Sequence, residues 1–208
     1  NELLENKIVD YAIDNERKYA LFNIIDKHFK GEQVDPEGLD VDLFGYQPAF
    51  DTFHTRSLIK IHDGCNNFCS YCLIPMVRGR ATSRSDKDIY DNIRSVVDHG
   101  FKEIVLTGVN MGRYQYQDVK FENLIENILR IEGDFRLRIS SIEPDNFSDR
   151  FLHLFENEKL APHMHICLQS GAENTLKAMR RHYTAAEFKN MCDRIKTAIP
   201  DFNITTDL

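Results

Sequence analysis

Three cysteines, Cys65, Cys69 and Cys72, are the residues whose spacing most clearly indicates chemistry. They follow the pattern C-x3-C-x2-C directly after the apolar-alternating run 58–62, so a single loop can bring three thiolates to one inorganic centre. A four-iron cluster is usually held by four thiolates. Three thiolates leave one iron with an open position for a substrate or cofactor, so the loop predicts a reactive centre.

The composition bounds the class of protein. With 208 residues, 42% hydrophobic and 28% charged, the chain can form one large domain or one domain with an appendage. It has no apolar run of about 18 residues and no signal-peptide pattern, so we expect no membrane partner and a cytoplasmic location. In a reducing compartment, the clustering of three of the five cysteines indicates metal or redox chemistry instead of disulfides.

The charge of the chain limits its partners. A net charge of −7 and a pI near 5.6 argue against non-specific binding of nucleic acid by the whole surface. A local basic patch stays possible, because arginines cluster after the cysteine loop (Arg78, Arg80, Arg84) and again at Arg180 and Arg181. Arginine suits bidentate capture of a carboxylate or phosphate, but charge clusters are more often solvated, and the pattern alone leaves both interpretations open.

The chain divides into two predicted parts. Apolar residues recur near the helical period over residues 1–30, with a break at Asp14-Asn15, and Gly, Pro and Asp dominate residues 31–55. We therefore expect a helical segment plus linker over 1–52 and a folded domain over 53–208.

Strands and helices alternate in the second part. Short apolar runs predict strands at 58–62, 103–107, 136–140, 164–169 and 204–208, and amphipathic helices are expected after Ser85, from Phe121, after Ser148 and from Phe188. This order is typical of right-handed βαβ units with a parallel sheet, either open or rolled into a barrel. Because the chain ends on a predicted strand with no helix to cover it, we interpret it as a truncated domain.

Polar residues follow each predicted strand at its carboxyl end, which is where function gathers in α/β barrels. Along 163–169, the odd-numbered residues share one face and the even-numbered apolar residues the other. We therefore expect Cys167 to line the lumen without acting as a ligand and Cys192, on a helical apolar stripe, to belong to the core.

The cysteine loop, with Tyr71 directly before the third cysteine, resembles the signature of radical S-adenosylmethionine (SAM) enzymes. Four longer strings are similar to the methylthiotransferases of that superfamily, namely residues 54–67 (HTRSLIKIHDGCNN), 106–112 (LTGVNMG), 168–171 (LQSG) and 179–184 (MRRHYT). Residues 163–169 (HMHICLQ) look most like the branch that acts on N6-threonylcarbamoyladenosine in tRNA. The resemblance covers residues 53–208, and residues 1–50 are similar to the tail of the preceding domain of that family.

The resemblance implies a partial (βα)6 open barrel and a set of site residues. Cys65, Cys69 and Cys72 match the ligands of a [4Fe-4S] cluster, whose open iron is chelated by the methionyl group of SAM. The implied SAM contacts are Tyr71 beside the cluster, Gly108 and Glu143 at the methionyl amine, Gln169 and Asp207 at the ribose, and Arg181 at the carboxylate. These residue types suit the groups they would bind. Arg180 stays a surface candidate.

The implied reaction is reductive cleavage of SAM to methionine and a 5′-deoxyadenosyl radical, which abstracts hydrogen from C2 of the adenosine so that the base can be methylthiolated. The implied partners are tRNA and a cellular one-electron reductant. The family holds a second [4Fe-4S] cluster with three cysteines of an upstream domain, and no such triad exists in this sequence. We therefore expect this chain to bind one cluster and SAM, but not to methylthiolate tRNA by itself.

Two alternatives remain at this point. The substrate can instead be isopentenyladenosine in tRNA or a ribosomal protein. In a different class of function, the three cysteines and His62 or His99 would form a structural zinc site in an RNA-binding module. Structural zinc favours four tetrahedral ligands, and a long parallel α/β scaffold is a poor match to a small zinc module.

Overall fold

The computed structural model describes residues 2–50, 54–144 and 147–208, and the chain forms two compact units that meet between Gln47 and Pro48. The domain boundary expected at residues 52 and 53 lies outside the described residues. Each unit is described separately below.

The smaller unit contains α1 (Glu2–Glu5), the 3-10 helix η1 (Lys18–Ala20), α2 (Leu21–Phe29) and η2 (Pro36–Gly38). The helical pattern expected over residues 1–30 is thus wrong for residues 6–13, 16 and 17, whereas the expected break at Asp14-Asn15 is present. Lys7 adopts a left-handed φ of 54°, and the Asp14 carboxylate accepts hydrogen bonds from the amides of Glu16 and Arg17 at 3.0 and 2.8 Å. Local bonds of this kind compete with helix formation.

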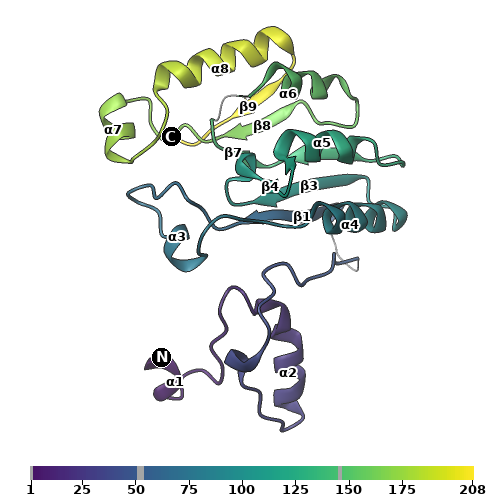
Figure 1. Cartoon of the computed structure of the whole chain (residues 1–208), viewed down its shortest axis with the longest axis vertical. Helices are drawn as coiled ribbons and strands as arrows, with labels where there is room; N and C mark the ends of the chain where they lie inside the picture. Colours follow the sequence, from purple (N-terminus) through teal and green to yellow (C-terminus); the bar gives the residue numbers. More distant parts are fainter. Residues whose placement is uncertain (1, 51–53, 145–146) are drawn as a thin grey trace. The chain divides into compact units, whose positions relative to one another are not determined.

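The larger unit is built on parallel strands (Figure 1). One sheet has the order β2 (Thr82–Ser83), β1 (Arg56–Asp63), β3 (Glu103–Gly108), β6 (Arg136–Ile139), and the second has the order β7 (Ser141–Ile142), β8 (His163–Ile166), β9 (Asn203–Thr205). β1, β3 and β6 pair in parallel, as do β7, β8 and β9, whereas β2 returns antiparallel along β1.

The two sheets are joined at Ser140. Its amide donates to the carbonyl of Leu106 at 3.2 Å, while Leu137 forms a parallel bridge with Leu160 on the approach to β8. The strand predicted at 136–140 is therefore two short strands with a bend between them. The bend curls the parallel strands into part of a barrel, which confirms the predicted α/β fold class.

Helices follow the strands as predicted. α4 (Asp86–Asp98) begins at Ser85, whose hydroxyl accepts from the amide of Asp88, and α6 (Asp149–His153) begins at Ser148, whose hydroxyl accepts from the amide of Phe151. α8 (Ala185–Ala198) begins with a reciprocal capping box between Thr184 and Glu187. The remaining elements are α3 (Ile74–Val77), η3 (Met111–Arg113), β4 (Gln115–Tyr116), β5 (Val119–Lys120), α5 (Phe121–Leu129), η4 (Leu154–Glu156) and α7 (Glu173–Ala178).

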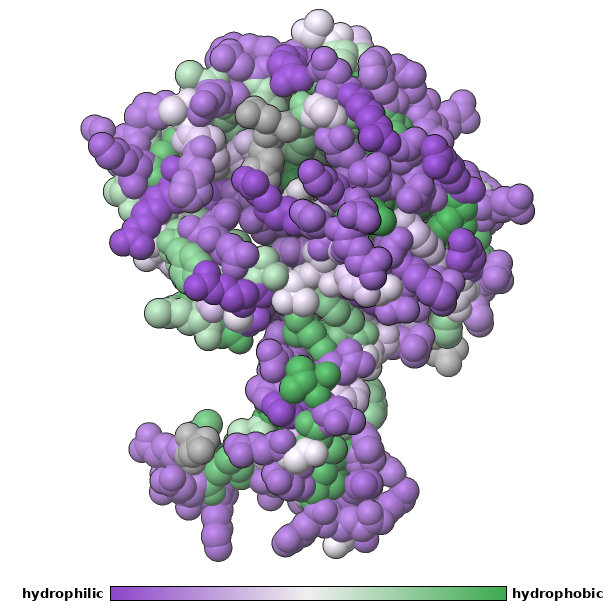
Figure 2. Space-filling model, viewed as in Figure 1, coloured by the Kyte–Doolittle hydropathy of each residue, from purple (hydrophilic) through white to green (hydrophobic). Residues whose placement is uncertain are grey.

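One hydrophobic core joins the helices to the strands. Ile89 and Ile93 of α4, Leu124 and Ile128 of α5, and Ile195 of α8 are buried in the same cluster as the inward side chains of the strands. On the opposite faces of the helices charged residues dominate, and Figure 2 shows mostly hydrophilic residues over the visible face of this unit. Within the described ranges, no helix is long and apolar enough to cross a membrane.

Candidate active site

The cysteine loop begins where β1 ends. Gly64 has a left-handed φ of 66° and lies against the backbone of Arg80, a position with no room for a side chain. The amide of Cys65 donates to the carbonyl of Gly79 at 3.2 Å. The carboxylate of Asp63, which is fully buried, accepts from the amide of Gly64 at 2.8 Å and forms an ion pair with Lys60. These contacts fix the backbone that leads into the first cysteine.

The same loop is tied to the far end of the domain. The hydroxyl of Ser70 donates to the carbonyl of Ala178 at 2.9 Å, and the amide of Ser70 donates to that of Met179 at 3.1 Å. Ala178 ends α7, so the loop after β1 and the helix after β8 lie side by side at one end of the sheet. In Figure 1, α3, α7 and the carboxyl terminus gather at that end, on the left.

Hydrogen-bond donors lie close to the sulfurs of Cys65 and Cys69. The amide of Asn67 lies 3.4 Å and the side-chain amide of Asn110 3.8 Å from Sγ of Cys65. Nη1 of Arg181 lies 3.1 Å from Sγ of Cys69. Donors aimed at sulfur stabilise its anionic form and tune a metal bound to it. The loop is thus suited to thiolates that hold a positively charged centre.

Arg181 connects several of the predicted site residues. Its guanidinium pairs with the carboxylate of Glu143, lies 3.5 Å from the hydroxyl of Tyr71, and donates through Nε to the hydroxyl of Tyr183 at 3.0 Å. The side chain of Arg181 is 3% exposed, and that of Glu143 is 20% exposed. Burial by itself lowers the pKa of Arg181, but the Glu143 carboxylate together with the hydrogen bonds to Tyr183 and Cys69 outweighs burial and raises it. Arg181 is therefore a buried, permanently charged group.

Tyr71 and Tyr183 lie beside this ion pair. The hydroxyl of Tyr183 donates to the carbonyls of Cys167 and Leu168, both at 2.8 Å, and burial raises its pKa to about 12. Burial also raises the pKa of the Tyr71 hydroxyl, although Tyr71 is half exposed. Both phenols are neutral at ordinary pH and act as hydrogen-bonding groups.

The remaining predicted contacts lie at the ends of β3, β8 and β9. A side chain at Gly108 would meet the carbonyl of His62 at 2.6 Å, so the close packing of β1 and β3 already requires glycine there. Gln169 has a left-handed φ of 69°, and its amide donates to the carbonyl of Asp207 at 3.0 Å. The structure thus brings Gln169 and Asp207 together just beyond the carboxyl ends of β8 and β9.

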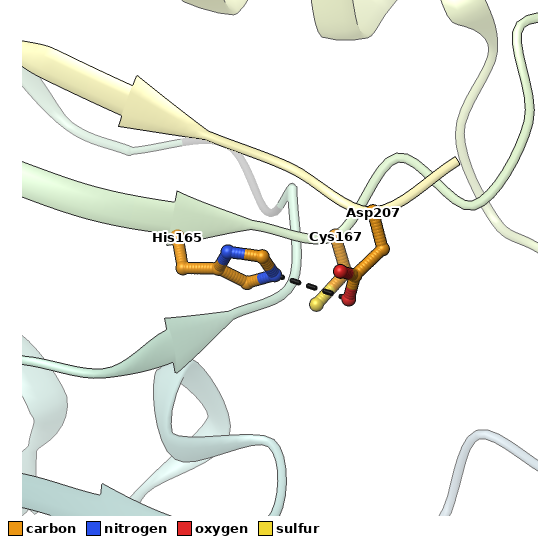
Figure 3. Close-up of side chains that lie close together, drawn as sticks. All are labelled: His165, Cys167 and Asp207. Carbon is orange, nitrogen blue, oxygen red and sulfur yellow. Dashed lines mark hydrogen bonds and ion pairs between the residues drawn. The ribbon is translucent and has the colours of Figure 1, made fainter.

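A cluster of three polar side chains lies at the same end of the second sheet. His165, Cys167 and Asp207 present ligand-type atoms that all lie within 4.8 Å of one another (Figure 3). In the parts of the chain that the structure describes, no other group of three or more His, Cys, Asp or Glu side chains meets this criterion. The three loop cysteines are thus not gathered with His62 or His99 around a single ion, as a zinc site requires.

Several predicted roles can be compared with the contacts. Cys167 directly follows β8, is half-buried and lies 3.4 Å from the hydroxyl of Ser141, and Cys192 packs against the core. Among the arginines left open, Arg84 is 5% exposed and thus buried, Arg78 pairs with Asp63, and Arg80 lies over the ring of Phe68. Arg180 is exposed and adopts a left-handed φ of 57°.

Some site residues were not predicted from the sequence. Asn110 has a left-handed φ of 52°, donates towards Cys65 and carries a buried Oδ1 with no hydrogen-bond partner in the structure. The signal for Asn110 was its place directly after Gly108-Val109 at a strand end, because Asn tolerates the left-handed conformation better than most residues. Tyr183 gave no comparable signal, whereas the alternation over 163–169 had placed His165 on the face opposite the apolar one.

A parallel half-barrel with a three-cysteine loop at its carboxyl edge defines a cofactor-binding α/β enzyme scaffold. Comparison with known families makes this assignment specific. Residues 59–208 match the model of the Radical SAM superfamily. The chain belongs to this superfamily.

Relatives of known function share this region. The chain is 41% identical over 165 residues to threonylcarbamoyladenosine tRNA methylthiotransferase MtaB of Bacillus subtilis, an alignment that covers 77% of this chain and 36% of the relative. It is 40% identical over 151 residues to tRNA-2-methylthio-N(6)-dimethylallyladenosine synthase of Endomicrobium trichonymphae, covering 72% of this chain and 36% of the relative. The chain thus spans little more than a third of the length of these relatives.

Solved structures share the fold. The radical SAM methyltransferase TsrM of Kitasatospora setae, solved with tryptophan and a SAM analogue, superposes with a TM-score of 0.58 at 19% identity and covers 73% of this chain and 29% of that one. The cobalamin-dependent SAM radical enzyme OxsB superposes with a TM-score of 0.60 at 14% identity and covers 93% of this chain and 32% of that one. At these identities the likeness supports the fold alone.

Proposed function

We propose that this chain is the radical-generating part of a tRNA methylthiotransferase, with Cys65, Cys69 and Cys72 as the ligands of a [4Fe-4S] cluster. When bound, such a cluster supplies one electron and an open iron position to SAM. The observation that most supports the proposal is the contact between Arg181 and Cys69, because it places a carboxylate-binding side chain directly beside a cluster ligand.

The charges beside Cys69 complement the methionyl end of SAM. That end is a zwitterion with one amine and one carboxylate, and Arg181 and Glu143 present one guanidinium and one carboxylate in direct contact. When SAM binds, its carboxylate takes donors of Arg181 and its amine takes Glu143, so the buried charges remain paired throughout. The carbonyl of Gly108 lies next to β1 at the same edge and is proposed as a further acceptor for the amine.

The ribose end is proposed to contact Gln169 and Asp207. The backbone hydrogen bond between them brings the two residues together just beyond the ends of β8 and β9. An amide and a carboxylate are well suited to a pair of ribose hydroxyls. Tyr71 is proposed to shield the cluster side of the cofactor.

The proposed tRNA substrate is N6-threonylcarbamoyladenosine. The support is the 41% identity to the Bacillus subtilis relative, together with the string at 163–169. Dimethylallyladenosine in tRNA is the second candidate, because the relative from Endomicrobium trichonymphae is 40% identical. A reductant and a second cluster in another part of the polypeptide are also proposed.

The test begins with anaerobic reconstitution of the chain with iron and sulfide. We expect about four irons per chain, a spectrum that changes when SAM is added, and 5′-deoxyadenosine once a chemical reductant is present. A colourless zinc-loaded protein, or a cluster whose spectrum ignores SAM, contradicts the proposal.

The substrate is tested with anticodon stem-loop RNAs that carry threonylcarbamoyladenosine, dimethylallyladenosine or unmodified adenosine. We expect 5′-deoxyadenosine formation to respond most strongly to the first. A stronger response to the dimethylallyl RNA would assign the second candidate instead.

A further inference from the structure

Asp207 follows β9, and its side chain is 65% exposed but also has a partner in the protein. Nε2 of His165, on the neighbouring strand β8, lies 3.1 Å from its Oδ2. Figure 3 shows the imidazole reaching from β8 towards the carboxylate, with the sulfur of Cys167 beside them. An exposed carboxylate on a chain segment beyond the last paired residue of a strand has several rotamers open to it. The contact with His165 selects one of them.

His165 is itself held from the other side. Its Nδ1 lies 3.0 Å from Oγ1 of Thr205, the residue directly opposite it in the β8/β9 register. The same hydroxyl lies 3.4 Å from Nε2 of His163. The ring of His165 therefore spans the two strands, with one nitrogen on Thr205 and the other on Asp207.

The donors and acceptors along this chain of side chains are mutually consistent. With neutral imidazoles, His163 donates from Nε2 to Thr205, Thr205 donates to Nδ1 of His165, and His165 donates from Nε2 to Asp207. Burial lowers the pKa of His163, which favours its neutral form. Each donor in this series then faces an acceptor, and the Asp207 carboxylate accepts a hydrogen bond from Nε2 of His165.

A metal site is the competing use of the same group. Nitrogen, sulfur and oxygen donors together are a set that zinc accepts. Structural zinc takes four ligands, however, and this group offers three, while the sulfur of Cys167 already shares a hydrogen bond with Ser141. The contacts of the group therefore favour a hydrogen-bonded network.

We propose that His165 is a positioning residue, which holds the Asp207 carboxylate in the orientation that receives the ribose of SAM. This inference rests on the proposed function. A side chain outside the set of proposed cofactor contacts thereby orients one of them, because His165 bonds both Thr205 of β9 and the carboxylate of Asp207.

The test is a double-mutant cycle on SAM affinity, measured with the reconstituted protein at equal iron content. We expect Asp207→Ala to weaken binding about 10-fold or more, since it removes a hydrogen bond to a charged acceptor, and His165→Ala to weaken it roughly 3- to 10-fold. Because His165 acts through Asp207, the double variant should bind SAM no more weakly than Asp207→Ala alone. Additive losses would overturn the proposal.

A matched pair of variants separates positioning from packing. Glutamine places its side-chain amide near the position of the histidine Nε2, so His165→Gln keeps a donor for Asp207 and should restore most of the affinity. Asparagine reaches only the Nδ1 position, so His165→Asn should bind SAM as weakly as His165→Ala. Equal affinities for the Gln and Asn variants would contradict a positioning role.

The outcomes also separate this inference from the proposed function. If the unsubstituted protein holds its cluster but binds no SAM, the proposed function fails. If it binds SAM and Asp207→Ala has no effect, the proposed function stands and the positioning role is wrong. If EDTA weakens SAM binding by the unsubstituted protein but not by His165→Ala, the group is a metal site, and the positioning role is also wrong.

Discussion

Arg181 and Cys69 are 112 residues apart in the sequence, and Nη1 of the arginine lies 3.1 Å from the sulfur of the cysteine. The contact joins the loop after the first strand to the turn after α7. Arg181 directly follows Arg180, whose φ of 57° is left-handed. One buried cation thereby serves both a predicted cluster ligand and the carboxylate of Glu143.

The first prediction concerns this cation. Arg181→Gln removes the guanidinium that pairs with the Glu143 carboxylate, and we expect the free energy of unfolding to fall by about 2 kcal/mol, as for the loss of a hydrogen bond to a charged group. SAM affinity should fall at least 10-fold, because the carboxylate of the cofactor loses its guanidinium. Denaturant titration and SAM binding measure the two effects.

The neighbouring residue provides the control for this prediction. Arg180 is exposed, so Arg180→Gln should change the free energy of unfolding by no more than about 0.5 kcal/mol. SAM affinity should also stay within about 2-fold, since Arg180 has no place in the proposed cofactor contacts. Similar losses in both variants would mean that general positive charge, and not the Arg181 contact, is what matters.

The second prediction concerns the cluster ligand. Cys69→Ala should abolish cluster binding, because two remaining thiolates cannot hold three irons. The fold should persist, since Cys69 lies outside the hydrophobic core. Iron and sulfide counts after reconstitution, together with far-UV circular dichroism, measure both. Cys192→Ala is the control and should keep a full complement of iron.

Particular residues show how far the sequence predicts this molecule. The helix from Phe121, the helices that begin after Ser85 and Ser148 and the alternation of parallel strands with helices were predicted correctly, because local periodicity and capping chemistry specify them. The bend at Ser140 was not predicted, because it depends on a hydrogen bond to Leu106 on another strand.

The candidate site follows the same division. The motif with its three cysteines is local and was recognised directly. Arg181 and Glu143 entered only through the family resemblance, as separate contacts to SAM, and their ion pair was not predicted. The helical period over residues 6–13 was misleading, whereas the break at Asp14-Asn15 was predicted, and there the side chain of Asp14 satisfies nearby amides in a non-helical conformation. Apolar spacing reports which face of an element is buried, but it does not report a competing local hydrogen bond.

The third prediction tests the close approach of β1 and β3. Gly108→Ala places a methyl group 2.6 Å from the carbonyl of His62, and the strands must separate to accept it. We expect a loss of about 1–3 kcal/mol in the free energy of unfolding. Gly171→Ala is the matched control, because no atom lies within 4 Å of the added methyl. Equal stabilities for the two variants would show that the strands yield easily at this point.

The fourth prediction concerns pH. His62 is 1% exposed, its Nδ1 donates to the carbonyl of Val109, and burial lowers its pKa below the ordinary value near 6.5. In the unfolded chain, the imidazole takes up a proton as the pH falls below about 6.5, whereas the folded protein resists protonation until lower pH. The stabilising contribution is therefore present above pH 6.5 and is lost as the pH falls towards the folded pKa.

His62→Asn isolates this contribution, because asparagine retains an N–H donor for Val109 and does not titrate. The asparagine variant should be less stable at pH 7, since it fills the buried site less well. Between about pH 6.5 and 5, however, its free energy of unfolding should fall less steeply than that of the unsubstituted protein. Denaturant titrations at several pH values measure both slopes. Parallel slopes would mean that His62 takes up its proton as readily in the folded protein as in the unfolded chain.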